Sequence, residues 1–144
     1  MLKKCYLLIG CFVLLACGSN KVSKTLTPLE ESTYLLVGQG GGVTGEYEEY
    51  ILRKSGHVYK WDDMNGKATL KGSLGGEKTE KVFQDWMELS IEGGQPPKAG
   101  NMNYRILYHS TEKTFFIRWG DNQQMSAEIM SFYKDTFGAL RQAE

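Results

Sequence analysis

The sequence predicts an α+β domain with a mainly antiparallel sheet of about four to six strands and two helices packed on one face. Three observations predict this class. Several runs between residues 33 and 119 alternate apolar and polar residues at period two, which is the pattern of a strand. Two other segments repeat their apolar residues every three or four positions, as an amphipathic helix does. Short turn-like segments join successive strand runs, and such connections favour antiparallel pairs.

The first half of the domain consists of strand segments. Residues 33–39 (TYLLVGQ) form a short apolar run before a group of glycines, and residues 46–53 (EYEEYILR) follow those glycines. Neither side of the second run is purely apolar, so we expect that strand to be half exposed. A turn around Gly56 leads to a third strand at residues 57–61, and residues 67–74 (KATLKGSL) fit a fourth.

The pattern becomes helical at Thr79, which is the expected N-terminal cap of the first helix. The pairs Gly93-Gly94 and Pro96-Pro97 are the expected end of this helix, because neither glycine nor proline favours its continuation. The residues at helical spacing are Val82, Phe83, Trp86, Met87 and Ser90 or Ile91.

A hairpin and a second helix complete the domain. Residues 102–109 and 114–119 alternate again, with a four-residue connection between them. The second helix follows, with Ser126 as its expected cap. Its apolar face consists of Ile129, Met130, Tyr133, Phe137 and Leu140.

The first residues differ in composition from all that follow. Lys3 and Lys4 precede an uncharged apolar run at residues 6–16. This run is too short to span a bilayer, which takes about 20 residues, but it has the length of a signal-peptide core. Its end, Leu14-Leu15-Ala16-Cys17, resembles the lipobox of bacterial lipoproteins. The alternative is a plain secretion signal, or a membrane anchor in which the cysteine is incidental.

The resemblance implies that residues 1–16 are a signal peptide and that Cys17 becomes the N-terminus and carries lipid, which attaches the protein to a membrane. Residues 17–32 are polar and would form a flexible tether, followed by a single domain at residues 33–144. We therefore expect a lipid-anchored protein of the bacterial cell envelope, at the outer membrane. Its domain would lie in the periplasm or at the cell surface.

Composition and motifs argue against several other functions. The net charge is zero, so nothing indicates a nucleic-acid partner. No metal site, cofactor or catalytic set is expected, since His57 and His109 lie in strand patterns without a neighbouring carboxylate motif. The polar segment 62–67 (DDMNGK) is predicted to be a turn. The glutamates that follow the glycines are expected to form a solvated strand edge: Glu46, Glu48 and Glu49.

The glycine-rich segment matches the spacing G-x-G-x-x-G at Gly40, Gly42 and Gly45. A dinucleotide site needs a helix after this loop, to direct free N–H groups at phosphate, whereas here a glutamate-rich strand follows. The segment is therefore predicted to connect two antiparallel strands. Three consecutive glycines exceed what a tight turn requires, and glycine permits close approach of another backbone. The candidate contact site for another protein comprises Gly40, Gly41, Gly42, Val43, Thr44 and Gly45.

The stretch GGGVTGEYEEYIL, followed by helix, hairpin and helix, resembles the emfourin family of small protein inhibitors of thermolysin-type metallopeptidases. The order of elements matches over most of residues 34–140. Five residues match the family's Gly-Gly-aromatic-x-Gly motif, with Val43 in the aromatic place: Gly41, Gly42, Val43, Thr44 and Gly45. The resemblance implies a non-enzymatic protein that inhibits a peptidase.

The sequence thus favours a lipid-anchored binding domain whose partner is a protein, with peptidase inhibition as a specific form. The alternative is an accessory lipoprotein that binds a small ligand or a glycan, and an enzyme is the third hypothesis. Aromatic side chains would line the ligand surface, although their alternation predicts the core first. These are Trp61, Tyr104, Tyr108, Phe115 and Trp119. The oligomeric state stays open.

Overall fold

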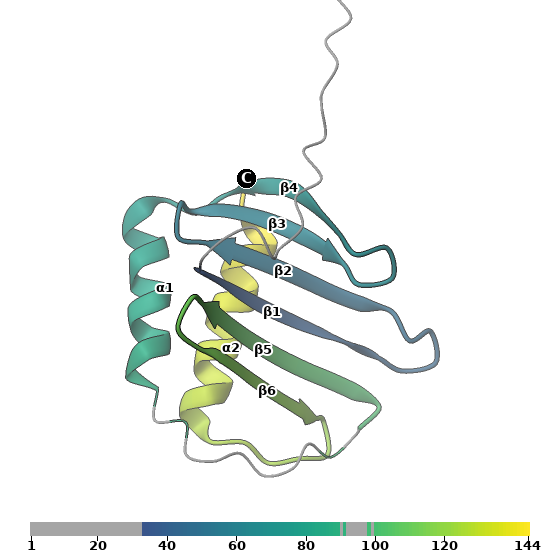
Figure 1. Ribbon diagram of the computed structural model, residues 1–144. Helices are drawn as coiled ribbons and strands as arrows, with labels where there is room; N and C mark the ends of the chain where they lie inside the picture. The colour runs from purple at the N-terminus through teal and green to yellow at the C-terminus, as the bar shows by residue number, and fades with distance from the viewer. Residues whose placement is uncertain (1–32, 90, 92–97, 99) are drawn as a thin grey trace, which may run out of the picture.

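The computed structural model describes residues 33–89, 91, 98 and 100–144, and in this part of the chain it contains one antiparallel sheet and two helices (Figure 1). The six strands follow the order β4-β3-β2-β1-β5-β6, so β1 and β2 are interior and β4 and β6 are edges. The predicted α+β class with a mainly antiparallel sheet is confirmed. Residues 1–32, with the expected signal peptide, Cys17 and the tether, lie outside the described residues.

The element bounds agree with most of the predicted segments. The run at residues 67–74 forms a strand up to Ser73, and the runs at 102–109 and 114–119 pair as the predicted hairpin. The elements are β1 (Thr33–Gly41), β2 (Tyr47–Arg53), β3 (His57–Asp62), β4 (Lys67–Ser73), α1 (Gly76–Glu88), β5 (Met102–Ser110), β6 (Thr114–Gly120) and α2 (Ala127–Gln142).

The strand β2 is buried, so the prediction of a half-exposed strand was wrong. It pairs with β1 on one side and β3 on the other. Its central residues Tyr50, Ile51 and Leu52 are at most 4% exposed. Alternate residues join different clusters: Tyr50 and Leu52 pack in the main core, and Ile51 packs in a second cluster. Both faces of β2 are thus covered. The alternation of polar and apolar residues along this strand did not predict that both faces would be buried.

The main core joins both helices to one set of alternate strand residues, among them Leu35, Val37 and Ile106. Phe83 of α1 and Phe132 of α2 belong to this same cluster. Aromatic rings contact one another between the helices and the sheet. The ring of Trp86 on α1 stacks on that of Tyr108 on β5, with 5.8 Å between the ring centroids. A further group of rings connects α2 to the sheet: Tyr50, Tyr104, Trp119, Tyr133 and Phe137. Such aromatic pairs add about 0.5–1.5 kcal/mol beyond their buried area.

The other set of alternate strand residues forms a second cluster, which contains no helix residue among those described. Its buried members are Tyr34, Leu36, Ile51, Tyr59 and Ala68. The sheet therefore has a helix-covered face and a second face that carries both apolar and charged side chains.

The first helix begins earlier than predicted, and Thr79 is not its cap. Gly75 is the N-cap and makes no side-chain cap bond. Thr79 lies one turn inside, where its buried hydroxyl donates to the carbonyl of Leu74 at 3.1 Å. The apolar pattern begins one turn late, since the first turn of the helix is polar. The helix ends at Glu88, ahead of the expected stop at Gly93-Gly94 and Pro96-Pro97, which lie outside the described residues.

The second helix follows the prediction closely. The Ser126 side chain accepts a hydrogen bond from the backbone N–H of Ile129 at 3.3 Å, which is the expected cap. Its buried face consists of Ile129, Phe132, Tyr133, Thr136, Phe137 and Leu140. Within the described residues, neither helix is both long enough and apolar enough to cross a membrane.

Candidate functional site

The glycine segment connects β1 and β2, which pair antiparallel as predicted. The N–H of Gly41 donates to the carbonyl of Glu46 at 3.1 Å and closes the turn. The next N–H, that of Gly42, donates to the carbonyl of Asn101 at 2.6 Å. This second bond ties the turn to the segment that leads into β5. The glycine hairpin, residues 40–46, is therefore held on two sides.

The glycines of this hairpin have two different roles. A Cβ at Gly40 would lie 2.4 Å from the carbonyl oxygen of Glu46 and 2.5 Å from the ring of Tyr47, so no side chain fits there. Gly41 has φ +118°, and a Cβ would lie 2.7 Å from the oxygen of Asn101. Gly42 and Gly45 are surrounded by open space but have φ of +71° and +67°, which L side chains rarely adopt.

Exposure divides the sequence-predicted contact residues into two groups. Gly40 is buried and Gly41 is half-buried, so they shape the turn. The other four, Gly42 to Gly45, are exposed, and Val43 presents its whole side chain with a relative exposure of 108%. The surface that can meet a partner is therefore the tip of the hairpin.

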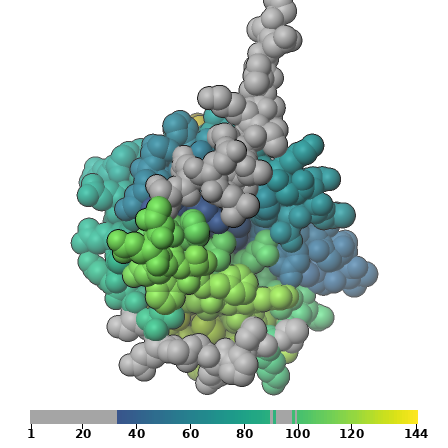
Figure 2. All heavy atoms as spheres, viewed as in Figure 1, coloured from purple at the N-terminus to yellow at the C-terminus, as the bar shows by residue number. Residues whose placement is uncertain are grey.

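A second hairpin tip lies at the same end of the sheet, between β3 and β4 (Figure 1). The predicted turn is confirmed there, since the carboxylate of Asp62 accepts bonds from the backbone N–H and the side-chain amide of Asn65 at 3.1 and 2.7 Å. Met64 at this tip is 91% exposed. In the space-filling view the two hairpins lie next to one another at one end of the molecule (Figure 2).

A shallow depression of about 690 Å³ is shared by the two hairpins. Its walls combine aromatic rings with both signs of charge. The lining residues are Gly45, Glu46, Tyr47, Lys60, Trp61, Asp62, Asp63, Met64, Thr69, Leu70 and Lys71.

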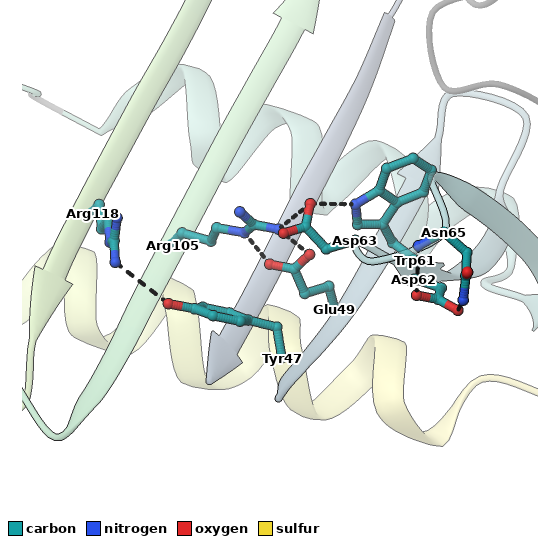
Figure 3. A network of polar contacts seen from close by, with 8 residues as sticks. All are labelled: Tyr47, Glu49, Trp61, Asp62, Asp63, Asn65, Arg105 and Arg118. Carbon is teal, nitrogen blue, oxygen red and sulfur yellow. Dashed lines mark hydrogen bonds and ion pairs between the residues drawn. The ribbon is translucent and has the colours of Figure 1, made fainter. Parts of the chain in front are cut away.

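A buried ion pair lies on the second face of the sheet, near the same end (Figure 3). Glu49 on β2 is 0% exposed, and its carboxylate contacts the guanidinium of Arg105 on β5. The two residues are not on neighbouring strands, because β1 lies between them. The β1 residue in register with both is Gly38.

Gly38 makes this ion pair possible. A Cβ built at Gly38 would lie 2.6 Å from Cγ and 2.8 Å from Oε1 of Glu49. Because β1 has no side chain at this position, the carboxylate and the guanidinium can meet above its backbone. The pair therefore connects β2 directly to β5.

Other polar and aromatic groups surround the guanidinium. Arg105 also lies 3.5 Å from the carboxylate of Asp63, which accepts a bond from the Trp61 indole at 3.4 Å. The ring of Tyr47 lies 5.2 Å from the guanidinium carbon, and its hydroxyl accepts a bond from Arg118 at 3.4 Å. Figure 3 shows these side chains converging from four strands and the turn after β3. We call this set, with Glu49, the Arg105 network.

Burial and pairing act in opposite directions on each member of the ion pair. Burial raises the pKa of Glu49, and the hydrogen bond and charge of Arg105 offset this only in part. Burial acts to lower the pKa of Arg105, but the hydrogen bond and charge of Glu49 outweigh it and the net direction is upward. Each group is thus engaged by the other, and the pair bridges β2 and β5 across β1.

The prediction of a solvated edge of glutamates was wrong for two of its three residues. Glu46 is exposed. Glu48 is half-buried and accepts a bond from the Tyr50 hydroxyl at 2.7 Å, while Glu49 is fully buried. Burial and this bond raise the pKa of Tyr50 to about 12. The glycine directly across from Glu49 on β1 was the available signal, since a strand glycine permits close approach.

The two histidines each lie close to a nearby hydroxyl group. His57 is exposed, with its ring 2.8 Å from the Ser55 hydroxyl. His109 lies 2.9 Å from the Thr114 hydroxyl and packs against the ring of Tyr34.

Most of the candidate ligand aromatics belong to the core, as alternation predicted. Tyr108 and Trp119 are at most 7% exposed, and Tyr104 stacks on Trp119. Of the five, only Trp61 lines the depression. In the described part of the chain no three His, Cys, Asp or Glu residues are grouped so as to hold a metal ion. The chain matches no protein-family model, and no curated protein is significantly similar to it.

Proposed function

We propose that this protein is a lipid-anchored binding domain of the bacterial envelope that contacts another protein through the tip of the glycine hairpin. The observation that carries the proposal is the full exposure of Val43 on a turn that glycines hold in place. Burying a valine side chain in a partner contributes about 1.5–3 kcal/mol. Because the turn is already ordered by bonds from Gly41 and Gly42, little conformational entropy opposes binding.

The exposure of Met64 supports the proposal that this end of the molecule contacts a protein. Single exposed apolar residues are ordinary on proteins. Val43 and Met64, however, are the most exposed large hydrophobic residues of the described chain, and they occupy neighbouring tips. Two apolar tips at one end fit a partner with an apolar cleft. A peptidase is the specific partner that the likeness to emfourin implies.

Replacing Val43 by Glu tests the contact surface. The variant should lose binding to its partner at least tenfold, since a charge in an apolar cleft must be desolvated. Met87→Glu on α1 is the matched control, because Met87 is also exposed, at 57%, but lies on a different element. Gly41 is a poor test position, because its φ and the nearby Asn101 oxygen would strain the fold.

The measurement is capture of envelope proteins from the native membrane with the full chain, followed by inhibition assays on a purified thermolysin-type peptidase. The protein-contact proposal requires a partner that the parent and Met87→Glu retain and Val43→Glu loses. Equal capture by all three would refute it. Absence of inhibition with a retained partner would refute only the peptidase form.

Growth on labelled palmitate tests the anchor. The proposal rests on Leu14-Leu15-Ala16-Cys17. Label should enter the parent chain and should be absent from Cys17→Ser, which should also leave the membrane fraction. One acyl chain binds membranes only marginally, so stable retention requires the multiple chains of a bacterial lipoprotein. An unlabelled parent chain contradicts lipid anchoring.

A second candidate function is favoured by the depression between the hairpins. Trp61 and Tyr47 provide aromatic surface there, and Lys60 and Asp63 provide polar groups, which suits a glycan or another small polar ligand. Trp61→Ala should then abolish ligand binding measured by calorimetry, whereas Val43→Glu should leave it intact. Loss of protein capture in Val43→Glu, with capture retained in Trp61→Ala, supports the protein partner instead.

A further inference from the structure

The strand β6 leaves half of its backbone groups facing away from the sheet. Ser110 N–H donates to Lys113 O, and Asp121 N–H donates to Met102 O, so Lys113 and Asp121 are in hydrogen-bonded pairs with β5. These pairs recur every second residue in an antiparallel ladder. The residues that bond to β5 are therefore Phe115, Ile117 and Trp119. The N–H and C=O groups that point outward belong to Thr114, Phe116 and Arg118.

No described residue covers these outward groups. The only strand paired with β6 is β5, within the described chain. Most side chains on the strand are aromatic or branched, with Arg118 as its one charge, and Phe115 and Phe116 are 40% and 56% exposed. Such an edge is a template for pairing with another strand, and proteins usually protect it.

The opposite edge shows what protection looks like in this fold. The pairing of β3 with β4 is interrupted by a bulge between Val58 and Tyr59. Near its end, β4 is covered by the C-terminus, because Ser73 N–H donates to the carbonyl of Glu144 at 2.9 Å. Lys71 adds a charge on this strand and donates to the carbonyl of Ala143. The strand β6 carries one charge, that of Arg118, but as described it has neither a bulge nor a covering segment of the chain.

We propose that β6 pairs antiparallel with β6 of a second copy of this chain, centred on Phe116. In this register the outward positions match one another, Phe116 with Phe116 and Thr114 with Arg118. On the helix-covered face Phe115 lies opposite Ile117. No like charges are opposed along the free edge, and each outward residue donates and accepts one bond.

The symmetry of this register favours a second copy over an unrelated strand. A two-fold axis through Phe116 makes the contact isologous, so the assembly closes as a dimer and leaves no free β6 edge. Registers shifted toward the end of the strand would use Gly120, whose carbonyl already accepts a bond from Gln123. The result is one continuous sheet across two protomers.

Phe116→Pro is the sharpest test. Its N–H makes no bond to β5 in the ladder described, so proline removes a donor for the partner but none for the fold. The full chain extracted in detergent should have the mass of two chains by light scattering corrected for detergent. Phe116→Pro should raise the dimer dissociation constant roughly tenfold or more. A single-chain mass for the parent, or a folded Phe116→Pro that remains a full dimer, would overturn the proposal.

Cross-linking keeps the proposal testable if the proline variant does not fold. Phe116→Cys places two thiols opposite one another across the two-fold axis, and mild oxidation should join the chains. Val43→Cys is the control, since Val43 is exposed but lies on the glycine hairpin. The parent chain measures the background from its own cysteines. Equal cross-linking at positions 43 and 116 would contradict the pairing.

Discussion

At the residue scale, the Arg105 network depends on the absence of a side chain at Gly38 on β1. Gly38 is the one position on β1 over which Glu49 and Arg105 can meet. Removing one partner of a buried ion pair typically costs about 3–5 kcal/mol, because it leaves a buried charge unpaired. The ion pair is thus a poor source of net stability but a strict condition on strand register, since a one-residue slip of either strand would separate the charges.

Gly38→Ala should destabilise the fold by about 1–3 kcal/mol, because its methyl group would overlap Cγ of Glu49. The loss should shrink when Glu49→Ala is present, and the coupling should be about 0.5–3 kcal/mol in a double-mutant cycle. Gly138→Ala is the control. No atom lies within 4 Å of its added Cβ on α2, so it should stabilise by about 0.5–1 kcal/mol. Denaturant unfolding measures all four variants.

Glu49 should also give the fold a pH dependence of defined sign. Its folded pKa is raised above the ordinary value of 4.5, so the folded state binds the proton more tightly than the unfolded state does. Its contribution to stability is therefore complete below pH 4.5 and is lost as the pH rises through the folded pKa.

The difference in unfolding free energy between the parent and Glu49→Gln isolates this contribution from other groups. The parent should lose stability relative to Glu49→Gln as the pH rises above 4.5, by no more than about 1.4 kcal/mol per pH unit. A difference that grows in the parent's favour over this range would show that Arg105 outweighs burial.

The sequence predicted those features of single residues that depend on neighbours in the chain. It did not predict the contacts that depend on residues distant in the chain. Ser126, the turn at Asp62 and the glycine turn follow from short-range backbone chemistry, and the structure places all three as predicted. Glu49 and Arg105 are distant in the chain. Their pairing depends on the strand order, which no residue pattern specifies.

At the element scale, the two helices differ in how they begin. The α2 N-terminus has a serine cap, whereas the α1 N-terminus has Gly75 and no side-chain bond. The start of α1 is instead held from within by Thr79, whose hydroxyl satisfies the Leu74 carbonyl. Periodicity located both helices because each buries an apolar stripe. It misplaced the start of α1 because the first turn carries polar residues, which add nothing to the apolar pattern. Only their helix propensity could have marked that turn as helical.

Ser126→Ala should lower the unfolding free energy by about 1 kcal/mol, because the N–H of Ile129 then loses its partner at a helix end. Ser131→Ala on the same helix is the control, since its exposed hydroxyl bonds only to Asp135. That change should stay within about 0.5 kcal/mol. Equal losses in both variants would mean that the Ser126 bond adds no cap stabilisation.

At the scale of the whole molecule, the chain protects one sheet edge with its own end. Glu144 reaches Ser73 across the domain, and a Cβ at Gly72 would lie 2.4 Å from the Glu144 carbonyl carbon. The strand order therefore has two consequences. It places Glu49 on an interior strand, and it makes β4 and β6 the edge strands. The sequence predicted the strands but not their order, since loop lengths do not determine which edge β5 joins.

Deleting Ala143 and Glu144 should destabilise the fold by about 1–3 kcal/mol, because Ser73 loses its acceptor and buried Ala143 is removed. Thermal unfolding followed by circular dichroism measures the loss. The truncated chain should also aggregate faster below its melting transition, because the β4 edge is then uncovered in the folded state. An unchanged melting temperature would show that the C-terminus does not seal this edge.

The direction of β1 separates the start of the described domain from the glycine hairpin. The strand enters the sheet at Thr33 and delivers the glycine hairpin nine residues later, about 30 Å away at roughly 3.3 Å per residue. With Cys17 in a bilayer as proposed, the tether would join the domain at Thr33. Val43 and Met64 would then lie at the end of the sheet farther from the point of attachment, where the tether leaves them free to meet a partner.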